Sequence, residues 1–242
     1  MAFRKMSALA AALLVFVTVW GVCESGAGDA TVDFIIGAST PHPQSFLLDG
    51  DVLWALLPDG GAYRLAKRAA QVQLYEYENP ARGDEKFTGQ RLLGPGASQA
   101  LIHLAGSWTL QEGPVVFAKT DHVLIDYSFG KEITPPTPAT FAIGGRVFRV
   151  LAELRPADGT LKSLRVILED GDERQELYAS GQATDPFAAL EWIGDLDRDG
   201  RPDLLLSVRY HYSTVSHRLY LSSFAAGKEL TRHVGSIEVS LD

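Results

Sequence analysis

One nine-residue stretch near the C-terminal end constrains the local structure of this chain more than any other. It reads Asp195-Leu-Asp-Arg-Asp-Gly-Arg-Pro-Asp203, with four carboxylates and a glycine after the third of them. Carboxylates this close repel one another, so the spacing is unfavourable without a counter-charge. A bound Ca²⁺ reverses that cost, because it takes six to eight oxygen ligands at about 2.3–2.6 Å. The stretch therefore predicts a calcium-binding loop.

The spacing also predicts which groups hold the ion. We expect Asp195, Asp197, Asp199 and Asp203 to offer side-chain oxygens and Arg201 to offer its backbone carbonyl. The glycine at position 200 permits the positive φ that folds such a loop back. A plain acidic turn is the alternative, because Asp and Gly are common in solvated turns. Four aspartates around a correctly placed glycine favour calcium.

The flanks of the loop exclude an EF-hand. The twelfth loop position would need a bidentate Glu, and Leu206 stands there. Residues 188–193 and 203–208 are short apolar runs of strand length. We therefore expect the loop to connect two β-strands.

Residues 192–206 resemble the calcium loop of FG-GAP/VCBS-type repeats, in which D-x-D-x-D-G-x-x-D joins two strands of a sheet. The resemblance implies the same set of calcium ligands, from Asp195 to Asp203. Arg198 stands where that family commonly has a small glycine. Only one copy of the motif is present, so we do not expect the multi-bladed propeller that many copies build.

The N-terminal residues have the pattern of a secretory signal peptide. Arg4 and Lys5 precede an apolar run from 8 to 22, and small residues follow, with cleavage expected after Ala27. Cys23 is the single cysteine, so the mature chain has no internal disulfide. The prediction is a signal peptide at 1–27 and a mature β-rich domain at 28–242, periplasmic or secreted, without a stable membrane span. Lipid anchoring through Cys23 and an uncleaved membrane anchor are the alternatives.

The composition excludes two classes of protein. The formal net charge is −8 and no basic run is present, which argues against a nucleic-acid partner. Hydrophobic residues make up 46% of the chain, which is enough for a folded core and argues against disorder.

Short strand candidates bounded by turn residues follow one another along the chain, and no long helix is apparent. The sequence therefore predicts a mainly antiparallel all-β fold, sandwich-like or in two β lobes, with a lobe boundary at 131–139 around a proline-rich stretch. Residues 66–70 favour a helical turn and 72–77 alternate as a strand does. The strand candidates are 32–36, 52–57, 72–77, 101–104, 108–110, 115–118, 123–128, 141–143, 146–154, 161–168, 173–178, 188–193, 203–208, 217–222 and 237–241.

Other clusters of polar or aromatic residues have simpler explanations. His211 and His217, with tyrosines nearby, would suit a carbohydrate or metal surface, but a polar loop between strands is the favoured interpretation. Trp54, Trp108 and Trp192 would suit sugar stacking, but core positions are favoured, with Trp192 packed beneath the calcium loop. The chain contains neither G-x-S-x-G nor H-E-x-x-H.

These observations predict an exported calcium-binding β-protein, a binding or interaction module for a protein or carbohydrate rather than an enzyme. An extracytoplasmic hydrolase with a structural calcium site is the alternative, and a pocket with two carboxylates away from the loop would distinguish it. A purely structural component of the cell envelope is a third hypothesis.

Overall fold

The computed structural model describes residues 33–36, 39–40, 47–78, 86–94, 97–105, 110–128, 130–157, 161–211 and 213–240. The predicted signal peptide at 1–27, Cys23 and Trp108 lie outside these residues. Residues 31–242 form one compact unit. In the described ranges, the helical segments are the short 3₁₀ turns η3 (Ala97–Gln99) and η4 (Ser222–Phe224), and strands make up the rest of the regular structure. The all-β prediction is confirmed.

The largest sheet has ten antiparallel strands. They are β1 (Asp33–Ile36), β3 (Val52–Asp59), β4 (Ala62–Ala69), β7 (Ile102–Ala105), β8 (Gly113–Ser128), β9 (Lys131–Thr134), β14 (Phe187–Asp195), β15 (Asp203–His211), β16 (Thr214–Leu221) and β17 (Arg232–Ser240). The order is β1-β7-β3-β4-β8-β14-β15-β16-β17, and β9 pairs with β8. The end strands β1 and β17 lie next to each other, so the sheet curls until it is nearly closed. This arrangement is not a propeller, which repeats separate four-stranded blades.

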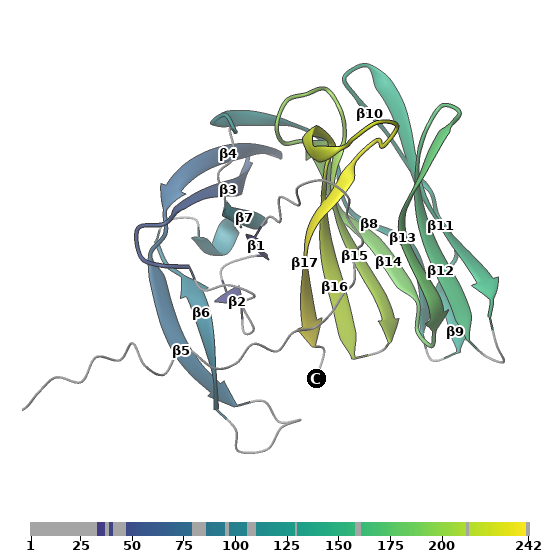
Figure 1. The fold of residues 1–242 in the computed structure, drawn as a ribbon, viewed down its shortest axis with the longest axis horizontal. Helices are drawn as coiled ribbons and strands as arrows, with labels where there is room; N and C mark the ends of the chain where they lie inside the picture. The colour runs from purple at the N-terminus through teal and green to yellow at the C-terminus, as the bar shows by residue number, and fades with distance from the viewer. Residues whose placement is uncertain are drawn as a thin grey trace, which may run out of the picture. The chain divides into compact units, whose positions relative to one another are not determined.

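Two smaller sheets complete the fold (Figure 1). One consists of β10 (Ala139–Ile143), β11 (Arg146–Pro156), β12 (Lys162–Asp170) and β13 (Glu173–Ala183), paired in chain order. The other has the order β2 (Ser39–Thr40), β6 (Lys86–Leu92) and β5 (Val72–Glu78). The predicted lobe boundary at 131–139 spans β9 and the connection to β10, where the chain passes from the ten-stranded to the four-stranded sheet.

The apolar run at the start of β15 is buried on both faces of the sheet. Leu204 and Leu206 belong to a cluster between the four-stranded sheet and strands β8, β14, β15 and β16. Leu205 belongs to a second cluster on the opposite face, with Trp192 and Leu219. Side chains alternate between the faces of a strand, and a strand covered on both faces needs a continuous apolar sequence.

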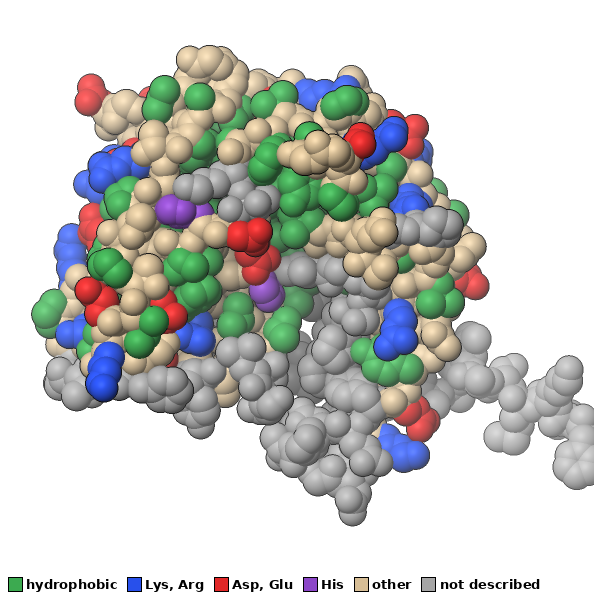
Figure 2. Space-filling view, turned by 180° about the vertical axis from the view of Figure 1, so that it is seen from behind, with side chains coloured by type: hydrophobic (Ala, Val, Ile, Leu, Met, Phe, Trp, Pro, Cys, Tyr) green, Lys and Arg blue, Asp and Glu red, His purple; other side chains and the backbone are tan. Residues whose placement is uncertain are grey.

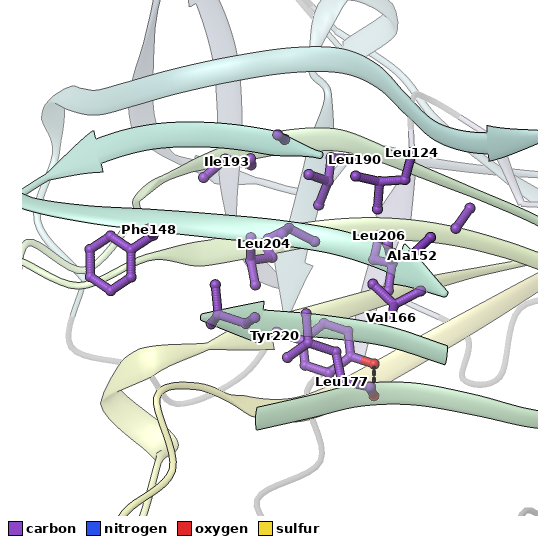
Figure 3. Close-up of a cluster of buried hydrophobic side chains, with 14 of the residues drawn as sticks. Leu124, Phe148, Ala152, Val166, Leu177, Leu190, Ile193, Leu204, Leu206 and Tyr220 are labelled. Carbon is purple, nitrogen blue, oxygen red and sulfur yellow. Dashed lines mark hydrogen bonds between the residues drawn. The ribbon is translucent and has the colours of Figure 1, made fainter. Parts of the chain in front are cut away.

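Tyr220 shows how a polar atom is satisfied in the first of these clusters. Its side chain is fully buried, and its hydroxyl donates a 2.6 Å hydrogen bond to the carbonyl of Leu177 on β13 (Figure 3). A tyrosine whose hydroxyl has a partner can be buried without the cost of an unpaired donor. The bond links the four-stranded sheet to β16.

Two predictions for residues 62–128 are wrong. Residues 66–70 do not form a helical turn, because 62–69 pair with β3 over their full length as β4. Residues 115–118 and 123–128 are not separate strands but parts of β8. Asp121 has a φ of 52°, and the register between β8 and β14 shifts twice, so the long strand bends without breaking.

Candidate metal centre

The sheet brings the two ends of residues 195–203, the acidic loop, side by side. Asp195 is the last residue of β14 and Asp203 is the first residue of β15, and Gly194 pairs with Asp203 in the ladder. The loop between them is therefore a strand-to-strand connection. The predicted strand–loop–strand arrangement is confirmed.

Two residues of the loop have left-handed backbone conformations. Gly200 has a φ of 81°, as the position of a glycine there predicts, and Arg198 has a φ of 66°. A residue with a Cβ rarely adopts this conformation, so Arg198 occupies a position that suits glycine better. Its guanidinium donates hydrogen bonds of 3.3 and 3.0 Å to the carbonyls of Gln111 and Glu112. Contacts outside the loop thus help to hold the strained residue.

Three of the predicted ligands converge. Carboxylate oxygens of Asp195, Asp197 and Asp203 all lie within 4.8 Å of one another. Asp203 is fully buried and Asp195 is 5% exposed. At an effective dielectric constant near 20, each pair of charges at this separation repels by at least about 3 kcal/mol. Three charges this close, two of them on buried residues and one on the partly buried Asp197, need compensation.

Hydrogen bonds compensate only part of this charge. Asp203 accepts 2.7 Å bonds from the amides of Leu196 and Ser222 and a 3.0 Å bond from the Ser222 hydroxyl. Oδ2 of Asp195 accepts a 3.0 Å bond from the amide of Gly200. Oδ1 of Asp195 and Oδ2 of Asp197 are buried and have no hydrogen-bond partner. Two acceptors of the cluster therefore remain for another donor or a cation.

The electrostatics of the cluster favour uptake of positive charge. Burial raises the pKa of Asp195, and the charges of Asp197 and Asp199 raise it further, against the amide bonds of the loop. Burial and the charge of Asp199 raise the pKa of Asp197, although hydrogen bonds from Ser223 oppose the rise. The pKa of Asp203 lies well above its usual value, mainly through burial and then through the charge of Asp197.

The other two predicted ligands, the Asp199 carboxylate and the Arg201 backbone carbonyl, belong to residues that are exposed. Asp199 is not among the three converging carboxylates. Its Oδ1 accepts a 2.8 Å bond from the Arg201 amide and lies 3.0 Å from the Ser222 hydroxyl oxygen. The side chain of Arg201 is exposed.

Residues outside the loop complete the surroundings of the cluster, and sequence reasoning did not find them. Ser222 and Ser223 belong to η4, directly after β16, and their polar groups lie within hydrogen-bond distance of three of the loop carboxylates. Gly144 lies in the turn between β10 and β11, and a Cβ there would come within 2.2 Å of the Gly200 carbonyl oxygen. No local pattern marks these residues, because their proximity depends on sheet pairing.

A cation would meet only oxygen atoms here. The converging side chains are carboxylates, without histidine or cysteine, and such donors suit hard cations such as Ca²⁺ and Mg²⁺. The two unpaired buried oxygens show that the residues fit a cation, because each provides an acceptor that the protein itself does not satisfy.

A second polar cluster lies on neighbouring strands β14, β15 and β16. The hydroxyl of Ser207 contacts a carboxylate oxygen of Glu191 and lies 2.7 Å from Nδ1 of His217, and the same Nδ1 lies 2.9 Å from that Glu191 oxygen. Burial acts to raise the pKa of Glu191, but the hydrogen bonds and charge of His217 and the Ser207 bond outweigh it, so the pKa is lowered. In a hydrolytic triad the histidine bridges the other two residues with its two ring nitrogens. Here one ring nitrogen faces both other residues, so the cluster does not have the arrangement of a hydrolytic triad. His217 and His211 lie in strands, not in a loop.

Comparisons of the chain with protein-family models, with curated proteins and with solved structures gave no match. None of the helical segments in the described part of the chain is long and apolar enough to cross a membrane.

Proposed function

We propose that the chain binds one Ca²⁺ at the loop 195–203, and that the ion stabilises this connection in an exported β-rich binding module. The observation that carries the proposal is the pair of buried, unpartnered oxygens on Asp195 and Asp197, beside the buried carboxylate of Asp203. A divalent cation would supply both oxygens with a partner and offset the repulsion among the three carboxylates. Asp199 and the carbonyl of Arg201 would complete the set, as the FG-GAP/VCBS-type resemblance implies.

Calcium is favoured over magnesium because the expected ligands are five protein oxygens, whereas Mg²⁺ usually keeps several of its waters. Mg²⁺ requires near-ideal octahedral geometry at 2.0–2.1 Å, whereas Ca²⁺ accepts variable numbers of oxygens at longer distances. If the dissociation constant is near 10⁻⁴ M and free calcium is near 10⁻³ M, binding stabilises the folded chain by about 1.4 kcal/mol. This stabilisation would order the loop without deciding whether the whole domain folds.

Calorimetric titration of wild type and two variants tests the proposal. Asp195→Asn retains an acceptor for the Gly200 amide but removes a charge and the unpaired carboxylate oxygen, so calcium affinity should fall at least about tenfold. Asp172→Asn, at an exposed hairpin turn, removes a charge away from the loop and should bind as wild type does. A stoichiometry of zero, or equal binding by the two variants, contradicts the site.

Proton release gives a second readout from the same titration. Because the pKa values of Asp195, Asp197 and Asp203 are raised, calcium must displace any bound protons, and affinity should weaken as the pH falls. The apparent binding enthalpy should then differ between buffers with different ionisation enthalpies, most clearly at mildly acidic pH.

The exported location is part of the proposal and rests on the N-terminal pattern at 1–27. Extracytoplasmic calcium, at millimolar concentration, would suit a weak site of this type. Intact-mass analysis of protein recovered from the periplasm or medium should find a chain that begins near Gly28. A lipid-modified chain that begins at Cys23 would overturn this location.

The partner class we propose is a protein or a carbohydrate. Basic and acidic side chains are interspersed over the described part of the face in Figure 2, and the net charge is −8. A polyanion such as nucleic acid would need a continuous basic surface.

A further inference from the structure

Arg198, in the middle of the acidic loop, is both exposed and strained. Its φ of 66° is left-handed, a conformation that a residue with a Cβ rarely adopts. Asp199, the next residue, is also exposed. Exposed loop tips are the preferred sites of proteolytic cleavage. The peptide bond between these two residues is therefore a candidate substrate for a protease that recognises arginine.

The closed loop protects this bond. Cleavage of a folded protein proceeds through a transiently opened state, because the protease has to hold the backbone on both sides of the bond in its own active site. In the loop, three consecutive amides, those of residues 199–201, donate to loop carboxylates at 2.8–3.2 Å. Residues 198 and 200 both have left-handed backbones. The protease therefore needs the loop to open before it can bind.

The side chain of Arg198 helps to keep the loop closed. Its guanidinium donates to Oε1 and to the carbonyl oxygen of Gln111 at 3.3 Å each, and to the carbonyl oxygen of Glu112 at 3.0 Å. Oε1 of Glu112 accepts a 2.8 Å bond from the amide of Lys67 on β4. Arg198 thus carries the cleavable bond and also ties the loop to the segment before β8.

A bound cation would determine how often the loop opens. Without an ion, repulsion among the carboxylates of Asp195, Asp197 and Asp203 opposes the closed loop. An ion that binds the closed loop lowers the population of the open loop, and the cleavage rate falls by the same factor. At a dissociation constant near 10⁻⁴ M and free calcium near 10⁻³ M, this factor is about ten.

We propose that the acidic loop is a calcium-gated cleavage site for an arginine-specific protease, an inference that rests on the calcium site proposed above. Loss of calcium opens the loop, and water hydrolyses the bond after Arg198, which leaves a carboxylate on Arg198 and an amine on Asp199. The cut separates β15, β16 and β17 from the chain before them. Arg201 offers no second site, because Pro202 follows it and lacks an N–H. Proteolysis then removes chains without calcium and spares chains that hold it.

Limited digestion of the full chain with trypsin tests the proposal, with the fragments identified by mass. A fragment that ends at Arg198 should appear about tenfold faster in chelator than in about 1 mM calcium. Asp195→Asn, which weakens the ion site, should be cut in calcium nearly as fast as in chelator, whereas Asp172→Asn should behave as wild type does. Calorimetry on the same samples separates the two proposals. A chain that binds calcium but is cut equally fast with and without it overturns the gating alone, and a chain that binds no calcium overturns both.

Two variants of Arg198 separate the cleavable bond from the side-chain contacts. Arg198→Lys keeps a trypsin site but loses the forked contacts to Gln111 and Glu112. Its cutting in calcium should rise about fivefold over wild type, with each rate divided by that of a peptide of residues 192–204 that carries the same residue at 198. Arg198→Gly suits the left-handed backbone, should still bind calcium and should give no cut at 198. An unchanged rate in Arg198→Lys, or no calcium-dependent cut after 198 in wild type, would overturn the proposal.

Discussion

Asp203 illustrates how the acidic loop depends on residues outside it. It is fully buried, and three of its hydrogen bonds come from Leu196 and Ser222. The Ser222 hydroxyl lies 3.0 Å from an oxygen of Asp203 and 3.0 Å from an oxygen of Asp199. A hydroxyl has one proton and can donate to only one of them. The carboxylate that does not receive this proton faces the lone pairs of the Ser222 oxygen. That contact is favourable only if the carboxylate carries a proton or a cation lies beside the two oxygens.

Ser222→Ala should therefore act on both stability and ion binding. It removes a buried hydrogen bond to a charged group, which is worth about 1.5–3 kcal/mol of unfolding free energy. Calcium affinity should also fall, because Asp203 and Asp199 lose the group that orients them. Urea denaturation with and without calcium measures both effects. A stability loss that is the same in calcium and in chelator would show that Ser222 does not act on the ion site.

At the scale of secondary-structure elements, the acidic loop contacts three other segments of the chain. Arg198 contacts the residues before β8, the turn between β10 and β11 touches Gly200, and η4 donates to the carboxylates. The loop is therefore a junction between the ten-stranded and four-stranded sheets. Ordering it with an ion should stabilise the contact between these sheets as well as the loop.

A pair of adjacent glycines tests this junction. Gly144 and Gly145 have φ values of 58° and 77°, so alanine at either position adds about 1–2 kcal/mol of left-handed strain. A Cβ at Gly144 would come within 2.2 Å of the Gly200 carbonyl oxygen, whereas nothing lies within 4 Å of a Cβ at Gly145. Gly144→Ala should lower both the melting temperature and calcium affinity more than Gly145→Ala does. Equal effects would mean that the turn does not support the loop.

At the scale of the whole molecule, the sequence predicted features that local spacing determines. The all-β class and the connection at 195–203 follow from apolar runs and turn residues that are close in the chain. Residues 66–70 were predicted as a helical turn. They are strand instead because most of them pair with β3 as part of β4, and this pairing cannot be read from the local sequence. Ser222 is 19 residues from Asp203, and no local pattern connects them.

Stability should fall in mild acid because of His233. Burial and the charge of Arg218 lower its pKa from 6.5 to about 4, although a bond to the Gly235 backbone opposes this. The unfolded chain then binds the proton more tightly, so stability falls as the pH drops from 6.5 towards 4. The loss from this residue should be roughly 2–3 kcal/mol between pH 7.5 and 4.5. His233→Phe keeps a ring beside Tyr220, and urea midpoints should show a smaller loss. Equal losses of stability in wild type and His233→Phe would contradict the role given to His233.

The most direct measurement of the central claim is the position of a bound ion. Crystals of the mature chain grown in millimolar calcium, with anomalous differences recorded, should show one ion per chain among the carboxylates of Asp195, Asp197 and Asp203. Oxygen distances of about 2.3–2.6 Å would identify calcium. A crystal that shows no ion among these carboxylates, with water or neighbouring donors satisfying the two unpaired oxygens, would contradict the account.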